Sequence, residues 1–442
     1  MHSANSTTAK LKLIFLYSSV FFSSHLASAQ ENSPYSRYGL GDIVPNRNIV
    51  SRGMGGISTG YADYLSINLS NPAALSKLLV TNFDIAGEVD LRRLKSNNAP
   101  AQFSSVNTVI SYLQFAFPLS TPKMLLKNRQ WNVGFGLKPV TRINYKIQEN
   151  ERLSGIDSLE TLYEGSGGLN QANISTAVRL NNFSFGVSAG YSFGNREYST
   201  RLNFINDTVP YARSTSEANT RFGGLALTLG TQYRIKLKSG GTILLGASAN
   251  LQQNLKAKKD NLNASYGFNS SGEIIHIDTV SSGLNQKGIL NIPATYSAGF
   301  TYTDSSGRFT LGADVDYTEW TKFRDYGKSD ALANTTVFHV GGQFQPTTLP
   351  TTKYWSTVKY RAGFYYGNDY VNINKKRSDY AVTLGAGLPL SFAAYDFVTF
   401  NTGIELGQRG NKQNQSIREG FTRIMIGVSV NANTWLRKRK YD

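Results

Sequence analysis

The segment FSFGVSAGYSFG, residues 183–194, decides how this chain folds, because apolar and small polar residues alternate along its whole length. Phe183, Phe185 and Val187 begin the apolar face, and the residues between them are serine or glycine. A period of two residues is that of a β-strand, whose successive side chains point to opposite faces. The same alternation recurs in residues 309–317 and 423–432. We therefore expect a chain built largely of strands, each with one strongly apolar face.

Counting these segments predicts an even number of strands, about fourteen, as single-chain bacterial outer-membrane barrels require. Short connections should lie at the periplasmic end, and long loops, residues 145–170, 195–219 and 255–288, at the outer end. The fold class predicted is all-β, a transmembrane antiparallel β-barrel with both termini periplasmic. The predicted strands are residues 82–93, 103–117, 130–144, 171–180, 183–194, 220–237, 241–254, 289–302, 308–323, 335–345, 354–366, 379–388, 396–407 and 420–435.

A soluble β-sandwich or propeller would also alternate, but two features disfavour it. The polar faces carry mainly glycine and serine instead of lysine and glutamate. Several segments also exceed the ~5–6 residues typical of strands in soluble sheets. The composition, with 25 Tyr, 24 Phe and 17% charged residues, suits membrane β-structure.

The first residues predict export. Lys10 and Lys12 precede an apolar run, residues 13–22, and Ala27-Ser28-Ala29 is an A-x-A cleavage site. We expect a signal peptide at residues 1–29 and a mature chain from Gln30. The chain has no cysteine, which excludes disulfides and a cysteine-linked lipid anchor. Its net charge of +17 favours anionic lipid head groups, acidic polysaccharide or acidic protein over nucleic acid as partners of an exported protein. We expect contact with outer-membrane lipids and none with nucleic acid.

The segment SRGMGGISTGYADYLSINLSNPAALSKL, residues 51–78, lacks the strand rhythm. Its glycines permit close backbone approach, and an Asn-Pro turn precedes its last apolar residues. We predict a hatch at residues 30–81 inside the lumen of a barrel at residues 82–436, followed by a basic periplasmic tail at residues 437–442. The predicted hatch residues are Gly53, Gly55, Gly56, Asn71, Pro72 and Ala73.

The sequence resembles the FadL/TodX family of outer-membrane transporters for long-chain fatty acids and other hydrophobic compounds. The resemblance covers nearly all of the mature chain. It rests on the segments Gly53–Gly56, Asn71–Leu75, Asn291–Ala294 and Asp316–Trp320. It implies a fourteen-stranded barrel with an N-terminal hatch, which captures a hydrophobic ligand at its outer loops and releases it sideways into the membrane. The basic ending departs from the usual aromatic last residue of such barrels.

Two functions follow as hypotheses. The first is passive uptake of a hydrophobic compound, such as a long-chain fatty acid, gated by the hatch. The second is a non-transporting accessory or carrier subunit of an outer-membrane assembly or secretion complex, with other outer-membrane proteins as partners. A transporter requires an apolar cavity that continues into a lateral gap, whereas an accessory barrel would have a sealed lumen and an adhesive face. Apolar residues of the long loops form either a collecting surface or local packing: Leu153, Ile156, Leu159, Leu162, Ile274, Ile275 and Ile277.

Charged residues on the lumen side offer candidate ligand contacts. Arg361 and Arg423 are our choices, because a guanidinium binds a carboxylate through two hydrogen bonds. The alternative, which we favour, is that these charges pair with one another and with the hatch. Catalysis is not expected: only His276 and His339 follow the leader, and no serine accompanies them in a recognisable pattern. The glycine cluster also lacks the Gly-Lys-Ser/Thr ending of a phosphate loop. We expect no cofactor and no metal.

Overall fold

The computed structural model describes residues 33–95, 102–153, 156–205, 211–349, 353–373, 377–391, 396–410 and 417–432. The predicted signal peptide and the basic tail lie outside these residues and stay predictions. No helix in the described part is long and apolar enough to cross a membrane. The helical elements are short: η1 (Pro34–Arg37), α2 (Ile49–Arg52), η2 (Pro72–Lys77), α3 (Pro122–Leu126), η3 (Trp320–Lys322) and α4 (Tyr354–Thr357).

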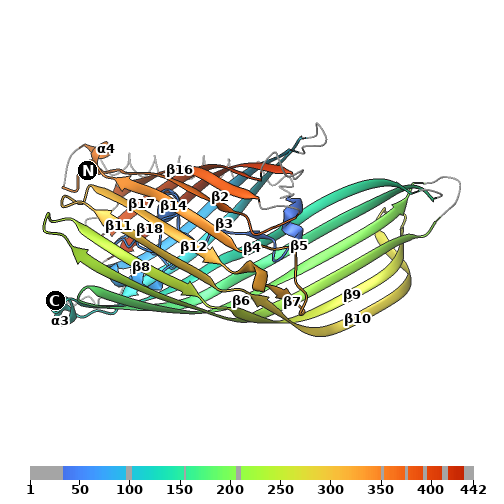
Figure 1. Cartoon of the computed structure of the whole chain (residues 1–442), viewed down its shortest axis with the longest axis horizontal. Coiled ribbons are helices and arrows are strands. Elements are labelled where there is room, and N and C mark those ends of the chain that lie inside the picture. The colour runs from blue at the N-terminus through green and yellow to red at the C-terminus, as the bar shows by residue number, and fades with distance from the viewer. Residues whose placement is uncertain are drawn as a thin grey trace, which may run out of the picture.

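The described strands form one 18-stranded antiparallel sheet that closes on itself, because β18 pairs with β2 along their whole length (Figure 1). Two members, β1 (Asp42–Ile43) and β13 (Arg324–Asp325), are two-residue segments. Two long strands are each divided by a bend: β8 (Thr242–Asn250) continues as β9 (Gln253–Phe268), and β10 (Ile274–Ile292) continues as β11 (Thr295–Thr303). Fourteen barrel strands result, which confirms the predicted fold class.

The remaining barrel strands are β2 (Thr81–Lys95), β3 (Gln102–Pro118), β4 (Arg129–Leu153), β5 (Ile156–Leu180), β6 (Phe183–Phe204), β7 (Arg213–Lys236), β12 (Phe309–Thr318), β14 (Thr335–Phe344), β15 (Lys359–Asn368), β16 (Ser378–Ser391), β17 (Asp396–Arg409) and β18 (Arg418–Ala432). Each overlaps a segment that the alternation predicts. The bend between β10 and β11 falls at Pro293, which has no N–H to donate to a neighbouring strand.

The prediction of three long outer loops is wrong. Residues 145–170, 195–219 and 255–288 are mostly strand, and they pair in register, as Tyr145 does with Gly165 and Glu197 with Asn219. Outside the bilayer, water can reach both faces of a strand, so the apolar–polar alternation fades although the backbone pairing continues. The period-two signal therefore ends where the membrane ends, and the strands do not.

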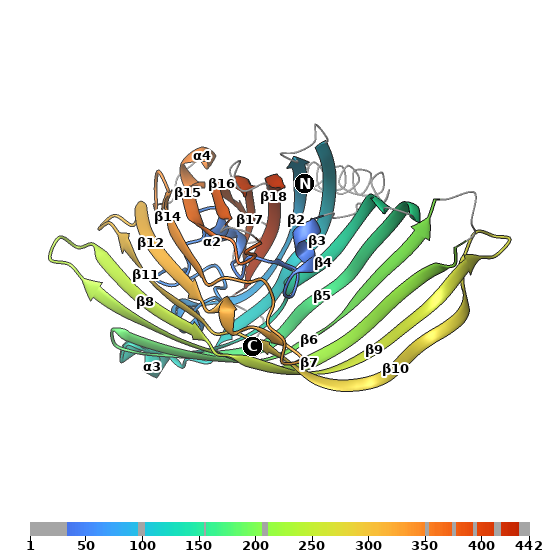
Figure 2. The ribbon, with the colours of Figure 1, turned by 45° about the vertical axis from the view of Figure 1, so that its right-hand side comes forward.

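These extensions form what we call the upper sheet, the outer parts of β4, β5, β6, β7, β9 and β10 (Figure 2). On one side, β3 pairs with β4 only from Leu113–Leu137 to Pro118–Asn132. On the other side, the described pairing of β10 away from β9 is limited to Leu290 and Asn291, which meet β13. The upper sheet therefore ends in two largely unpaired edges, whereas the membrane part of the barrel is closed.

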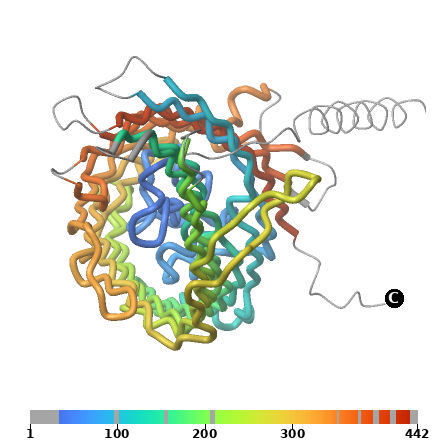
Figure 3. Tube along the Cα trace, turned by 90° about the vertical axis from the view of Figure 1, so that its right-hand side faces the viewer, coloured from blue at the N-terminus to red at the C-terminus, as the bar shows by residue number. Residues whose placement is uncertain are grey.

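The N-terminal residues run through the lumen, where Figure 3 shows them inside the ring of strands. Ser33 donates a hydrogen bond to Glu419 at the outer end of β18, and the chain reaches the opposite end at Thr81, which pairs with Ala432. The expectation that both termini are periplasmic is therefore wrong for the start of the described chain. These N-terminal residues thread the barrel from the outer end to the periplasmic end.

The lipid-facing surface yields a first prediction. Val340, in the middle of β14, is exposed on the outer face of the barrel, so Val340→Arg places a charge against the bilayer interior and should destabilise the folded barrel by about 2–4 kcal/mol. Ile277→Arg, at an even more exposed position of the upper sheet, is the matched control and should change stability little. Urea unfolding in lipid vesicles, followed by tryptophan fluorescence, measures both. Equal losses would mean that the upper sheet does not project beyond the membrane.

Candidate functional site

The plug segment, residues 44–80, touches the barrel wall backbone to backbone. Gly55 has a φ of +70°, and a Cβ added to it would lie 2.5 Å from the Val340 carbonyl oxygen. A Cβ on Gly60 would lie 2.5 Å from the Cα of Phe300. The wall also supplies a glycine, Gly363, which meets the backbone of Gly55. Any side chain at these places would push the plug segment off the wall.

The two groups of predicted hatch residues lie against different walls. Gly53 faces Gly385 of β16, and Gly56 faces His339 of β14, whose Nδ1 lies 2.7 Å from the Gly55 carbonyl oxygen. The Asn71-Pro72-Ala73 turn instead lies against Gly186 of β6 and Gly230 of β7. Contacts on both sides hold the plug segment across the lumen.

Asn71 shapes the turn before β2. Its Oδ1 accepts a hydrogen bond of 3.1 Å from the Ala73 N–H and so caps η2, and its Nδ2 donates to the Thr59 carbonyl oxygen at 2.8 Å. Pro72 occupies the first position of η2, where its missing N–H costs nothing. The turn that the Asn-Pro pair predicts is therefore present at this place in the structure.

A buried ion-pair network joins the plug segment to the wall. Arg52 lies between Glu88 of β2, at 2.5 Å, and Glu405 of β17, at 2.9 Å. Arg423 of β18 pairs in turn with Glu405 at 3.3 Å and with Asp90 at 3.2 Å. All five side chains are at most 5% exposed. Removing one partner of a buried pair typically costs 3–5 kcal/mol, so this network strongly opposes separation of plug and wall.

The network continues toward the outer end through Asp42 of β1. Its carboxylate pairs with Arg92 at 2.5 Å and with Arg409 at 3.3 Å. In the middle of the plug segment, Asp63 pairs with Lys359, the first residue of β15, at 3.1 Å. Burial alone would raise the pKa of the Asp63 carboxyl, but Lys359 and then Lys77 hold this pKa well below its usual value. The plug segment is thus held by ion pairs at several levels.

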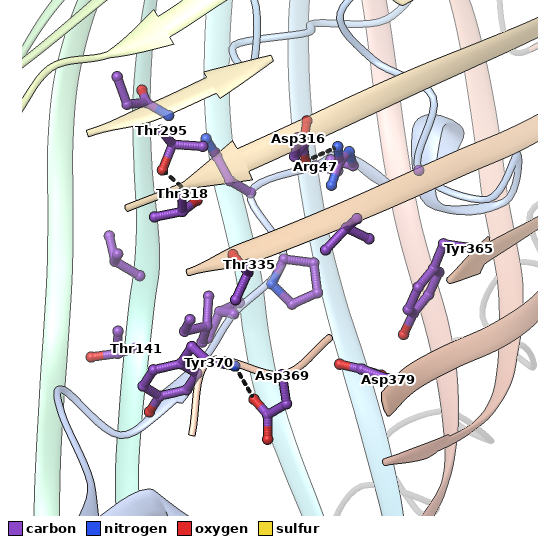
Figure 4. Close-up of a pocket in the computed structure, with 18 of the residues that line it drawn as sticks. Arg47, Thr141, Thr295, Asp316, Thr318, Thr335, Tyr365, Asp369, Tyr370 and Asp379 are labelled. Carbon is purple, nitrogen blue, oxygen red and sulfur yellow. Dashed lines mark hydrogen bonds and ion pairs between the residues drawn. The ribbon is translucent and has the colours of Figure 1, made fainter. Parts of the chain in front are cut away.

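Between the plug segment and the wall lies a cavity of about 300 Å³ (Figure 4). Its acidic lining residues have partners: Asp316 pairs with Arg47 at 2.5 Å, and Asp379 with Arg409 at 3.1 Å. The volume is at the lower end of the range for small-molecule sites, ~300–1,000 Å³. This is a small chamber lined by apolar side chains such as Leu40, Ile43 and Ile292, with paired charges set into its wall.

An apolar cluster that sequence reasoning missed closes the outer end of the lumen. Tyr35 and Leu40, from the start of the described chain, pack with Trp320, Phe323 and other residues of the outer connections. The remaining buried members are Leu169, Phe222, Leu255, Ala257, Leu290, Ile292, Leu332, Tyr370 and Val371. They come from strands and loops far apart in the sequence, so no local pattern announces the cluster. Two of its members, Ile292 and Trp320, lie in the quoted segments Asn291–Ala294 and Asp316–Trp320.

The separation of β3 from β4 is the nearest equivalent of a lateral gap. A bulge at Ser111 shifts the register of β3, and β4 is irregular between Pro139 and Thr141. The space between them is occupied by the start of the plug segment: Asn46 accepts a hydrogen bond from Lys138, and the lining includes Ser111 and Gln114. A solute leaving here would meet polar and charged groups.

The two candidate arginines have protein partners. Arg361 donates to Gln343 at 2.9 Å and to Asn401 at 3.0 Å, and it is not among the described residues that line the 300 Å³ cavity. Arg423 does line this cavity, with its ion pairs to Asp90 and Glu405 in place. Contact of either arginine with a ligand stays a prediction.

The two histidines and the apolar residues expected in the long loops lie in different parts of the structure. His339 packs on the plug segment, whereas His276 lies 3.2 Å from Glu217 in the upper sheet. Leu159 is buried, while Ile275 and Ile277 are exposed, and all three belong to strands and not to loops. The side chains of Leu153 and Ile156 lie outside the described part. Among the described residues, no group of three or more His, Asp or Glu side chains is placed to hold a metal ion.

A closed antiparallel barrel with an apolar outer face and an occupied lumen defines an outer-membrane β-barrel protein, located in the bacterial outer membrane. Among solved structures, the chain is similar to the Pseudomonas putida toluene transporter TodX (15% identity, TM-score 0.58, covering 88% of this chain and 99% of that chain). It is also similar to a Pseudomonas aeruginosa FadL homologue (12%, 0.54, 89% and 99%) and to the Ralstonia pickettii toluene transporter TbuX (14%, 0.52, 88% and 99%). At these identities the similarity establishes a shared fold.

The family model that matches this chain is not that of the FadL/TodX transporters. The BamG family model matches residues 10–442, and this chain belongs to the BamG family. No protein with curated annotation matches the sequence. The fold expected from the resemblance to FadL and TodX is therefore confirmed, while the family name is corrected to BamG.

The ion-pair network yields a second prediction. Arg52→Met leaves Glu88 and Glu405 without their plug-segment cation and should lower the free energy of unfolding by about 3–5 kcal/mol. Arg221→Met, which breaks an exposed pair with Asp260, is the control and should cost less than about 1 kcal/mol. Urea titration of both variants in vesicles gives the comparison. A loss for Arg52→Met no larger than the control's would show that the network does not hold the plug segment.

Proposed function

We propose that this protein is a non-transporting barrel subunit of a larger assembly in the outer membrane, in which the plug segment is structural. The observation that carries the proposal is the closure of the lumen at two levels. Buried ion pairs around Arg52 bind the plug segment to β2 and β17, and the apolar cluster around Tyr35 and Trp320 closes the outer end. A conduit needs at least one of these levels to open readily.

The energetics of opening support this reading. Moving the plug segment and the adjoining β1 away from the wall would leave Arg52 and Asp42 without their buried counter-charges. Glu88 and Glu405 would keep only Arg142 and Arg423 as ion-pair partners. Each uncompensated buried charge costs several kcal/mol, and no binding energy of a small apolar solute offsets such a sum. The exit between β3 and β4 presents Lys138 and polar side chains, which an apolar solute gains nothing by contacting.

The upper sheet supports the second half of the proposal. Its six strands extend beyond the closed barrel and have two largely unpaired edges. The apolar cluster already closes the lumen below these extensions. Unpaired edges are liabilities that proteins cover or use. A partner protein at the outer surface would be a reason to keep this sheet.

A second candidate is a channel for passive uptake of a hydrophobic compound, the first function expected from the sequence. It is favoured by the fold shared with proteins described as toluene transporters, by the 300 Å³ cavity, and by the separation of β3 from β4. In this case the plug segment would be the gate and would have to move.

Purification from native outer membranes under mild detergent separates the two functions. The subunit proposal expects the protein to migrate with other outer-membrane proteins at fixed stoichiometry on native gels, and mass spectrometry to find no fatty acid or similar compound in stoichiometric amount. A single chain that carries one hydrophobic molecule per copy, with no protein partner, would contradict the proposal and support the channel.

A disulfide lock tests whether the plug segment must move. The chain has no cysteine, and Gly53 faces Gly385 closely enough that a Cβ on Gly53 would lie 3.3 Å from the Gly385 Cα. In cells that depend on this protein, the oxidised G53C/G385C double variant should support growth as well as its reduced form, because a structural plug need not move. Each single variant is the control for steric effects. Growth or uptake lost on oxidation and regained on reduction would contradict a structural plug.

A further inference from the structure

The outer face of β7, β9 and β10 carries a basic patch directly above the lipid-facing band. Arg221, Lys258 and Lys287 lie in one row on adjacent strands, because Lys258 is paired directly opposite both of the others. Lys256 lies two residues from Lys258 on the same face. All four side chains are exposed. We call these four residues the basic row.

The side of the sheet follows from the register. Leu225, Leu227 and Leu229 are exposed on β7 and share the face of Arg221, since they differ from it by even numbers of residues. On β10, Ile289 is exposed on the same face as Lys287. The next residue, Leu290, points to the opposite face and is buried in the apolar cluster of the lumen. The basic row therefore points outward, away from the lumen.

The height of the row is given by the aromatic residues beneath it. Tyr191 and Phe193 of β6 are exposed, and their partners on β7 are Leu225 and Gly223, just below Arg221. Exposed aromatic side chains flank the apolar band of outer-membrane barrels at the interface. The basic row comes next toward the outside, at the level of the lipid headgroups of the outer leaflet.

The charges of the row lack compensation within the described chain. Arg221 pairs with Asp260 at 2.9 Å, but no anion within salt-bridge distance is found for Lys256, Lys258 or Lys287 among the described residues. Lys258 and Lys287 are directly opposite, an arrangement that destabilises a sheet unless an anion screens it. Three uncompensated lysines at headgroup height suit a phosphate group carried by a lipid.

We propose that the basic row binds the phosphate of an anionic lipid of the outer leaflet, whose acyl chains lie along Leu225 and Ile289. The lysine ammonium groups donate hydrogen bonds to the phosphate oxygens, and the apolar band receives the chains. The site lies on the outer surface and is independent of whether the lumen conducts. It orients the barrel and its upper sheet relative to the membrane surface.

Native mass spectrometry of the full-length protein in detergent, titrated with monophosphoryl lipid A, tests the site. The K256Q/K258Q/K287Q variant should bind this lipid about 100-fold more weakly than the wild type, since each lysine near an anionic lipid surface contributes about fivefold. K123Q/K127Q/K238Q removes the same charge from exposed lysines at the periplasmic end and should bind like the wild type.

Two further arms identify the ligand chemistry. Lipid A freed of its phosphate should bind the wild type as weakly as it binds the triple variant. Inorganic phosphate at equal concentration should not displace the lipid, because it lacks the acyl chains. The proposal is overturned if the triple variant retains wild-type affinity, if removing the phosphate changes nothing, or if inorganic phosphate competes fully; loss of lipid binding in both triple variants would also overturn it.

Discussion

Closure of the sheet between β18 and β2 is the constraint on which the rest of the structure depends. In a bilayer every backbone N–H and C=O group must find a partner within the protein, so the strands must form a ring. The ring creates a lumen wide enough that side chains of the wall alone do not fill it. The plug segment occupies this space, and the polar residues on the inner faces of the strands become its partners.

The N-terminal residues are held in the lumen by different interactions in the membrane part and at the outer end. In the membrane part, glycines on both surfaces let the backbones meet, and Arg52 binds carboxylates on opposite sides of the closing seam, Glu88 on β2 and Glu405 on β17. At the outer end, apolar side chains such as Tyr35 and Trp320 pack together, and a buried ion pair of Arg377 with Asp369 lies beside them. Both kinds of interaction bury the N-terminal residues against strands from the whole circumference, which makes the plug segment part of the folded core.

The upper sheet obeys a different rule from the barrel beneath it. Once the strands leave the bilayer, water satisfies an unpaired edge, and closure is no longer required. β3 then departs from β4, and β10 extends with β9 as its main partner. β4 to β7 thus serve as membrane wall in one half and as open sheet in the other, and β9 and β10 extend β8 and β11 into the same open sheet, with the basic row at the boundary.

The sequence alone determined the membrane strands, their even number and the irregular character of the segment that precedes them. Period-two alternation is a local consequence of placing a strand between lipid and lumen, as in residues 183–194. Asn71 and Pro72 likewise encode their turn locally. The tertiary structure alone decided that the strands run past the membrane, that the described chain begins at the outer end, and that Arg423 is committed to Asp90 and Glu405. These features depend on pairing between residues far apart in the chain, and a polar residue reads the same in sequence whether it faces water, a neighbouring strand or a buried counter-charge.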